Sequence, residues 1–254
     1  GKDGNAVGNP GYVLAVSISE GKELWRQPVN DPESSPAVDE AGIVYIGSGF
    51  NGSAIVAMRS ETDQELQDRK LARIVWQTPA AYPVTSAITL AGDLVIAGAG
   101  NSDYVYANPH PQGAVIALDR KTGQIRWQTN FEDAVLGEVA FGDGKLVCPL
   151  RTGEVAVLNA ADGKILWRSR VSGKAPVLAG CAFAADRIYA VSNDGYLAVM
   201  DASDGKILEK TYLNDQAKPG TGLSVSSPQV VGGHVIVGSE TGGLKAFIGL
   251  GGAK

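Results

Sequence analysis

The sequence lacks any long hydrophobic run, so it offers no segment that would cross a membrane as a helix. It also lacks an excess of positive charge: 22 Lys and Arg residues stand against 27 Asp and Glu residues, and the formal net charge is -5. Nucleic-acid-binding proteins usually carry a clustered basic face, so the sequence predicts no nucleic-acid partner. The missing hydrophobic run predicts no membrane-spanning segment.

Cysteine and histidine are scarce. Cys148 and Cys181 lie far apart and match no metal-ligand spacing, which leaves two interpretations open: buried free thiols, or one disulfide in an oxidising compartment. His110 stands between two prolines with no second histidine or cysteine beside it, so a metal role has weak support. His234 falls in a predicted strand, where we expect a structural role.

What the sequence does contain is a repeat. Residues 117–127 read ALDRKTGQIRW, and residues 157–167 read VLNAADGKILW. Three further copies are less complete: residues 199–209, which end in Glu209 in place of Trp; residues 15–25; and a copy that starts at residue 57 and ends at Trp76. A period of about 40 to 50 residues is typical of propeller blades.

Each copy predicts two strands joined by a tight turn, because glycine supplies the positive φ that hairpin turns need and the flanking residues alternate. Two inner strands are expected between copies, and we place them at 34–38 with 42–47, 84–90 with 93–98, 135–141 with 145–148, 176–183 with 187–191, and 226–230 with 233–238. The extra polar residues 64–70 predict a surface loop or one helical turn.

The fold expected is therefore an all-β propeller of four-stranded antiparallel blades, about five in number. We expect a single domain over residues 1–254, with flexible segments at 1–10 and 249–254. The strands add up to an outer hairpin (12–17 and 22–29), four whole blades and three strands ending near 244–248. Strand 22–29 is a candidate to close the ring as the outermost strand of the last blade.

The pattern Ala-x-Asp-x-x-Thr-Gly-x-x-x-Trp, complete at residues 117–127, resembles the docking motif of the pyrroloquinoline quinone (PQQ)-like repeat β-propeller family. The resemblance implies that tryptophans stack between adjacent blades, a role that falls to Trp25, Trp76, Trp127 and Trp167. Glu209 departs from it, which implies a weaker joint or one filled by an ion pair. Members often have eight blades, so a longer propeller with this chain as its C-terminal part is the alternative to closure by strand 22–29.

The resemblance implies two functions. One is a non-catalytic, extracytoplasmic binding scaffold of the bacterial periplasm or cell envelope, similar to the propeller lipoprotein of the outer-membrane β-barrel assembly machinery, which acts on protein partners. The alternative is part of a PQQ-dependent quinoprotein dehydrogenase that oxidises alcohols or sugars with PQQ and calcium. The adjacent cysteine pair common in those enzymes is absent from the sequence.

No catalytic, cofactor-binding or metal-ligating residue is predicted. Asp162-Gly163 and Asp204-Gly205 fit hairpin turns better than calcium sites. The best functional candidate is the polar loop at residues 100–111, GNSDYVYANPHP, which offers oxygen ligands, two aromatic rings and an imidazole. Two charged residues are expected near the predicted axis: Glu138, in the inner strand 135–141, and Arg187. A single ion pair between them would explain both charges without an active site.

Overall fold

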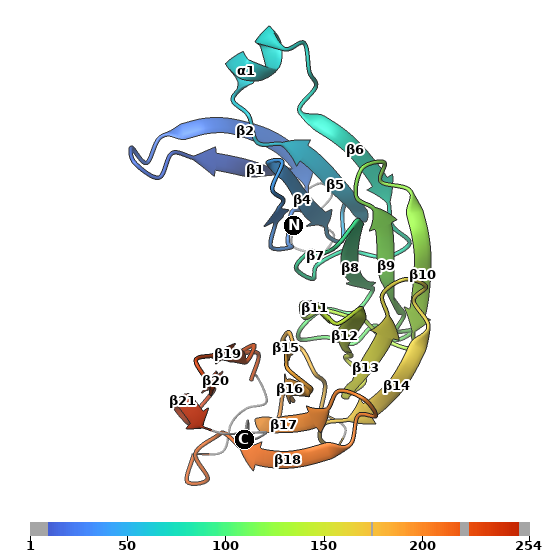
Figure 1. Cartoon of the computed structure of the whole chain (residues 1–254), viewed down its shortest axis with the longest axis vertical. Coiled ribbons are helices and arrows are strands. Elements are labelled where there is room, and N and C mark those ends of the chain that lie inside the picture. Colours follow the sequence, from blue (N-terminus) through green and yellow to red (C-terminus); the bar gives the residue numbers. More distant parts are fainter. Residues whose placement is uncertain (1–9, 174, 219–223, 249–254) are drawn as a thin grey trace.

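The structure is a computed structural model that describes residues 10–173, 175–218 and 224–248. In these ranges the chain forms 21 strands and one helix, and the strands pair in six antiparallel sheets. Figure 1 shows the sheets following one another along an arc, from the N-terminal hairpin to the C-terminal sheet. This arrangement is the predicted all-β propeller. The predicted flexible segments lie outside the described residues, except for Pro10, which begins the first strand.

Four sheets are complete blades of four strands paired in sequence order. The first blade contains β3 (Ala37–Val38), β4 (Ile43–Ser48), β5 (Ala54–Arg59) and β6 (Ile74–Pro79). The second contains β7 (Thr89–Ala91), β8 (Leu94–Gly100), β9 (Gly113–Asp119) and β10 (Ile125–Phe131). The third contains β11 (Ala140–Gly142), β12 (Lys145–Pro149), β13 (Glu154–Asn159) and β14 (Ile165–Arg170). The fourth contains β15 (Ala182–Ala184), β16 (Arg187–Val191), β17 (Tyr196–Asp201) and β18 (Ile207–Tyr212).

The two ends of the arc are incomplete sheets, as the strand count predicts. At one end β1 (Pro10–Val16) pairs with β2 (Glu23–Asn30), and at the other β19 (Gln229–Val231), β20 (His234–Ser239) and β21 (Gly243–Ile248) form a three-stranded sheet. The candidate closure by strand 22–29 is wrong for this structure, because β2 pairs along its length with β1 and does not join β21. Figure 1 shows the two end sheets apart, with the arc open between them.

The innermost strands are shorter than the sequence predicts. Strands β7, β11 and β15 begin at Thr89, Ala140 and Ala182, several residues after the predicted starts at 84, 135 and 176. The reason lies in the backbone hydrogen bonds of the preceding segments, whose N–H groups donate to the previous sheet: Val84 to Ser48, Val135 to Ala99 and Val177 to Leu150, at 3.0, 3.3 and 3.1 Å. These segments therefore join neighbouring blades near the axis.

The outer hairpins confirm the turn interpretation of the Asp-Gly pairs. Gly163 and Gly205 adopt φ of +71° and +77°, in the left-handed region that favours glycine. The carboxylate oxygens of Asp162 and Asp204 accept the N–H of the residue after the glycine, at 3.1 and 2.9 Å. The aspartates thus serve the turn itself.

Tryptophans lie where one blade meets the next. The indole Nε1 of Trp76, Trp127 and Trp167 donates to a carbonyl oxygen of the following sheet, at 3.1, 3.0 and 3.2 Å. Each ring also lies against the turn glycine of that sheet, so closely that a Cβ added to Gly163 would be 2.5 Å from Cε3 of Trp127. The hydrophobic clusters are likewise shared between neighbouring sheets: one joins Ile96 of the second blade to Leu146 of the third.

Two details complete the frame. A short helix, α1 (Asp63–Asp68), covers most of the extra polar segment 64–70 and confirms the predicted helical turn. Its N-cap Thr62 forms a capping box with Glu65. No helix in the described ranges has the length and apolar character that a membrane span requires. Glu209, which replaces the expected tryptophan, is exposed in β18 opposite Val199.

The contact between ring and glycine gives a matched pair of substitutions. Gly144 has φ of +69° and open space around its added Cβ, whereas Gly163 has the same backbone but meets Trp127. Gly144→Ala should cost about 1 kcal/mol through backbone strain alone. Gly163→Ala should cost about 3 kcal/mol because the methyl group also displaces the ring. Urea denaturation measures both free energies of unfolding.

The double variant Trp127→Ala/Gly163→Ala separates the two causes. Without the ring the added methyl loses its two closest contacts and meets only the Thr129 hydroxyl, at 2.8 Å, so the two changes should couple by more than about 1 kcal/mol instead of adding. Equal losses for the two alanine variants, or additive losses in the double variant, would show that the ring does not depend on the glycine.

Candidate functional site

The loop at residues 100–111 connects β8 to β9, as predicted, and its own side chains fix its shape. Asn101 holds its two ends together: its amide donates to the carbonyl of His110 at 3.0 Å, and its side-chain oxygen accepts the N–H of Gln112 at 2.8 Å. Asp103 Oδ1 accepts the N–H groups of Val105 and Tyr106 at 2.7 and 2.6 Å. The tip of the loop is therefore a defined turn.

A buried ion pair anchors the loop to the third blade. Arg151 Nη1 lies 3.2 Å from Asp133 Oδ2, and the two side chains are 12% and 10% exposed. Asp133 also accepts the hydroxyl of Ser102 at 2.6 Å, and Arg151 Nε donates to the carbonyl of Asp103 at 2.9 Å. Both charges are satisfied by each other and by the loop. The loop is therefore fixed by hydrogen bonds to this ion pair in addition to the hydrogen bonds between its own residues.

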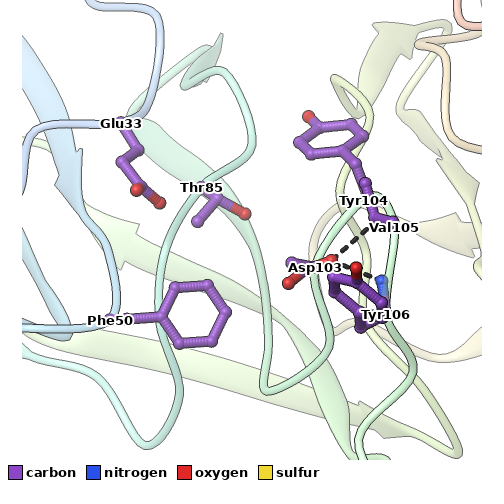
Figure 2. A pocket seen from close by; sticks show the side chains of 7 residues that line it. All are labelled: Glu33, Phe50, Thr85, Asp103, Tyr104, Val105 and Tyr106. Atoms are coloured by element: carbon purple, nitrogen blue, oxygen red, sulfur yellow. Dashed lines mark hydrogen bonds between the residues drawn. The ribbon is translucent and has the colours of Figure 1, made fainter. Parts of the chain in front are cut away.

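A pocket of about 440 Å³ opens between this loop and the first blade. Figure 2 shows Glu33, Phe50 and Thr85 on one side and the loop residues on the other. Glu33 comes from the connection between β2 and β3, Phe50 from the turn between β4 and β5, and Thr85 from the segment before β7. The other lining residues are Asp103, Tyr104, Val105 and Tyr106. Segments far apart in sequence thus build one site.

Among the described residues, Glu33 and Asp103 are the two charged ones that line the pocket, and Glu33 is the one without a partner. Asp31, in the left-handed region at φ +50°, holds the chain there: its carbonyl accepts the N–H of Glu33 at 2.9 Å. Burial of the carboxyl group and the negative charges of Asp31 and Asp103 raise the pKa of Glu33. The described residues give this carboxylate no hydrogen-bond donor and no cation, and none of the pocket's lining residues is basic.

Apolar and aromatic groups border the opening. Phe50, Val105 and Tyr106 are 46%, 65% and 73% exposed, large values for side chains of this size. Tyr104 is fixed more firmly, because its hydroxyl donates to the carbonyl of Leu136 at 3.0 Å. Burial, and to a smaller extent the charge of Glu33, raise the pKa of Tyr104, so the hydroxyl stays protonated.

Thr85 supplies an unsatisfied polar group in the wall. Its side chain is buried, with the residue 8% exposed, and its Oγ1 has no hydrogen-bond partner. Figure 2 shows the side chain between Glu33 and Tyr104. Buried polar atoms are normally paired, so this hydroxyl, whose oxygen is almost fully covered, is an unsatisfied group in the wall.

The pocket continues toward the axis. A second cavity of about 390 Å³ shares Glu33, Thr85 and Tyr104 with it and reaches Glu138. The expected strand position of Glu138 is wrong: it precedes β11, in a segment whose backbone bonds to the previous blade. Its side chain lines this cavity and a third one of about 410 Å³.

The remaining candidates lie outside the pocket. Arg187 begins β16 and pairs with Asp186 and Asp201 at 2.7 and 3.7 Å, a structural arrangement that does not include Glu138. The N–H of His110 donates to Asn108 at 2.9 Å. His234 begins β20, and its Nδ1 lies 2.8 Å from the carbonyl of Gly232.

The two cysteines are free and buried, which decides between the two interpretations. Burial raises the pKa of Cys181 to about 12 and that of Cys148 well above its ordinary value. Such thiols are poor nucleophiles and poor metal ligands at neutral pH. Within the described part of the chain, no three His, Cys, Asp or Glu side chains are arranged to hold a metal ion.

Sequence reasoning found the loop but missed Glu33, Phe50 and Thr85. Glu33 precedes the Ser-Ser-Pro pattern of the repeat, and Phe50 lies in a Gly-rich turn, so neither interrupts the repeat as the loop does. Asp133 and Arg151 also gave no signal, since their pairing depends on the packing of two blades.

The curated proteins similar to this chain include an assembly factor and a dehydrogenase. Outer membrane protein assembly factor BamB of Burkholderia pseudomallei is 27% identical over 191 residues, covering 70% of this chain and 46% of that protein. Quinohemoprotein alcohol dehydrogenase ADH IIB of Pseudomonas putida is 32% identical over 150 residues, covering 54% of this chain and 20% of that protein. The chain therefore spans less than half the length of either relative.

The crystal structure of BamB from Moraxella catarrhalis superposes with a TM-score of 0.63, covering 85% of this chain and 61% of that chain. At 18% sequence identity this likeness shows the fold alone. A family model described as outer membrane protein assembly factor BamB matches residues 111–254, which include both well-preserved copies of the repeat. Because the match covers more than half of the chain, the protein belongs to the family of outer membrane protein assembly factor BamB.

Proposed function

We propose that the protein is a non-catalytic scaffold that binds another protein outside the cytoplasm, in the bacterial cell envelope, and that it docks through the pocket at the loop 100–111. The observation that carries this proposal is the exposed apolar rim of Phe50, Val105 and Tyr106 around a preformed pocket. Membership in a family named for outer membrane protein assembly supports the location and the class of partner.

The rim has the composition of a protein interface. Aromatic side chains are enriched where proteins bind one another, and a few of them usually supply most of the binding energy. Here Phe50 borders a concave site from the turn between β4 and β5, and Val105 and Tyr106 border it from a loop that Asp133 and Arg151 hold in place. A preformed site loses less conformational entropy on binding than a mobile loop does.

The four tryptophans serve the scaffold in this proposal. Their Nε1 groups donate to backbone carbonyls of a neighbouring sheet, that of Trp25 to Ser60 at 2.7 Å. Those rings are committed to blade docking, which leaves the loops to bind the partner.

The similarity to a quinohemoprotein alcohol dehydrogenase favours a second candidate, a domain that binds PQQ with calcium. Two observations weigh against that candidate. The described residues offer no cluster of three His, Cys, Asp or Glu side chains for a metal, and the two cysteines are separate and buried. One fold hosts many functions, so the residues at the site decide between the two candidates.

The docking proposal is tested by removing the rim. In the variant Phe50→Ala/Val105→Ala/Tyr106→Ala, proteins retained from a Gram-negative envelope extract should fall at least about tenfold, because truncating interface aromatics commonly costs 2 kcal/mol or more. The measurement is quantitative mass spectrometry of proteins retained by the immobilised chain.

A matched control removes equally large exposed side chains elsewhere. Leu24, Leu166 and Leu208 lie on the outermost strands β2, β14 and β18 and are 46%, 50% and 44% exposed. Their triple alanine variant should retain the same proteins as the wild type. Retention that is lost only in this control, or in neither variant, would place docking elsewhere.

At neutral pH the charged side chain of Glu33 should lower the free energy of unfolding. Such a cost is common at residues that serve binding rather than stability. Its raised pKa means that the charged form is disfavoured in the folded chain, so Glu33 costs no stability while it is protonated, and its destabilising effect develops as the pH rises through the raised pKa. Glu33→Gln should therefore raise the melting temperature by about 1–2 °C at pH 7, because the group is solvent-accessible and the gain is at most about 0.5 kcal/mol. Below about pH 4 the difference should vanish.

Glu132→Gln is the control of opposite sign. A hydrogen bond from Arg168 lowers the pKa of Glu132, so this variant should melt at a lower temperature than the wild type at pH 7 and not at low pH. Calorimetry at both pH values compares the two. A lower melting temperature for Glu33→Gln at pH 7 would mean that the carboxylate has a stabilising partner.

The dehydrogenase candidate is tested by ligand binding. The thermal midpoint should stay unchanged with excess PQQ and millimolar calcium, since a ligand that binds only the folded chain must raise it. A saturable rise would favour the quinoprotein function over the scaffold.

A further inference from the structure

The pocket carries negative charge that nothing in it neutralises. Of its three nearby carboxylates, Asp31 accepts the N–H of Asn51 at 3.0 Å, and Asp103 accepts two N–H groups of its own loop. Glu33 has no donor and no cation among the described residues. The nearest arginine in the loop framework, Arg151, is paired with Asp133. Glu33 is an exposed residue, so water solvates its carboxylate in the isolated chain, and a ligand that covers this carboxylate has to bring a positive charge.

The aromatic rings suit the same ligand. Phe50, Tyr104 and Tyr106 border the cavity, and Figure 2 shows them around the space that Glu33 and Thr85 also face. The face of an aromatic ring attracts a cation, and more strongly when water is displaced. Ring faces beside an unpaired carboxylate therefore favour a cation with an apolar stem over a small hydrated ion.

Thr85 gives independent support. Its hydroxyl lies in the wall of the pocket and has no hydrogen-bond partner among the described residues, although the residue is only 8% exposed. A hydroxyl oxygen accepts hydrogen bonds. The oxygen is almost fully covered in the isolated chain, so a donor bound at Glu33 reaches it only after the Thr85 side chain rotates, and then satisfies a polar atom that the chain leaves unsatisfied.

These features favour arginine over lysine. The guanidinium group is planar, has five N–H donors and stacks on aromatic faces, whereas the ammonium group of lysine is a compact point charge. The planar fork can donate to a carboxylate and a hydroxyl on the same side of the pocket while its flat face lies against a ring, which the rounder ammonium group cannot match in contact area. The volume of about 440 Å³ also exceeds what a single ammonium group needs.

We propose that this pocket binds an arginine side chain of the partner protein, with Glu33 as its counter-ion, Thr85 as a hydrogen-bond acceptor and Phe50 and Tyr106 as stacking faces. This inference rests on the proposed protein-binding function and names the partner chemistry that the docking surface recognises.

The test uses three blocked tripeptides, acetyl-Gly-Arg-Gly-amide and its citrulline and lysine counterparts, followed by NMR titration of the whole chain. Citrulline has the shape of arginine without its charge. The arginine peptide should bind saturably and shift the amide signals of Thr85, Val105 and Tyr106, and the citrulline peptide should bind at least about fivefold more weakly. Binding should weaken from about 50 mM to about 500 mM NaCl.

Two variants locate the charge. Glu33→Gln should weaken the arginine peptide about fivefold or more, whereas Glu20→Gln, which removes an exposed carboxylate in the β1–β2 turn, should leave it unchanged. Melting temperatures of both variants verify folding. Equal binding of the arginine and citrulline peptides, or equal loss in both variants, overturns the proposal.

Agmatine, the free decarboxylated form of arginine, separates the two sources of a guanidinium group. Tighter binding of agmatine than of the arginine peptide would assign the pocket to a small cation and overturn the proposal. The two experiments distinguish failure of the docking function from failure of this inference. If the rim variant still retains the envelope proteins and the arginine peptide still requires Glu33, the docking proposal is wrong and the charge selectivity of the pocket stands. If the rim variant loses those proteins and the arginine peptide does not bind, only this inference fails.

Discussion

The contact of Trp76, Trp127 and Trp167 with the turn glycine of the next sheet is the constraint on which the arrangement of the blades depends. The indole ring occupies the space where a side chain on that glycine would lie, and its N–H bonds to the same turn. A turn with positive φ, a bare Cα and a flat ring are therefore required together. Because the contact repeats at successive blades, it sets how each sheet follows the one before, and the connections near the axis are brought together as a result.

The pocket is a consequence of that placement. Glu33, Phe50 and Thr85 come from three different connections, and the loop 100–111 reaches over them from the second blade while Arg151 and Asp133 hold it from the third. No short segment contains the site. Any change that moves one blade against the next also changes the distance between the carboxylate and the aromatic rings.

The repeat predicts features that depend on a few neighbouring residues, whereas the strand partners near the axis and the pocket depend on how the blades pack. Hairpin turns such as Asp162-Gly163, the inserted helix and the interrupting loop each leave a signal in a few neighbouring residues. The segments before Thr89, Ala140 and Ala182 read as strands because they are apolar, yet their N–H groups bond to the previous blade. Sequence alternation cannot distinguish those partners. Glu33 and Thr85 gave no signal because their roles arise only when the first two blades meet.

The energetics of the pocket differ from those of the frame around it. Asp133 and Arg151 satisfy each other, and the buried cysteines are inert, although a few buried side-chain atoms elsewhere in the described chain, such as Thr152 Oγ1 and Asn193 Oδ1, also lack a hydrogen-bond partner. The pocket differs in combining three such features: a carboxylate with a raised pKa, an unpartnered buried hydroxyl and exposed aromatic rings lie within one cavity. Each costs stability in the isolated chain, and one ligand with a positive charge, hydrogen-bond donors and a flat surface would satisfy all three. That coincidence distinguishes a binding site from a surface turn built of the same residue types.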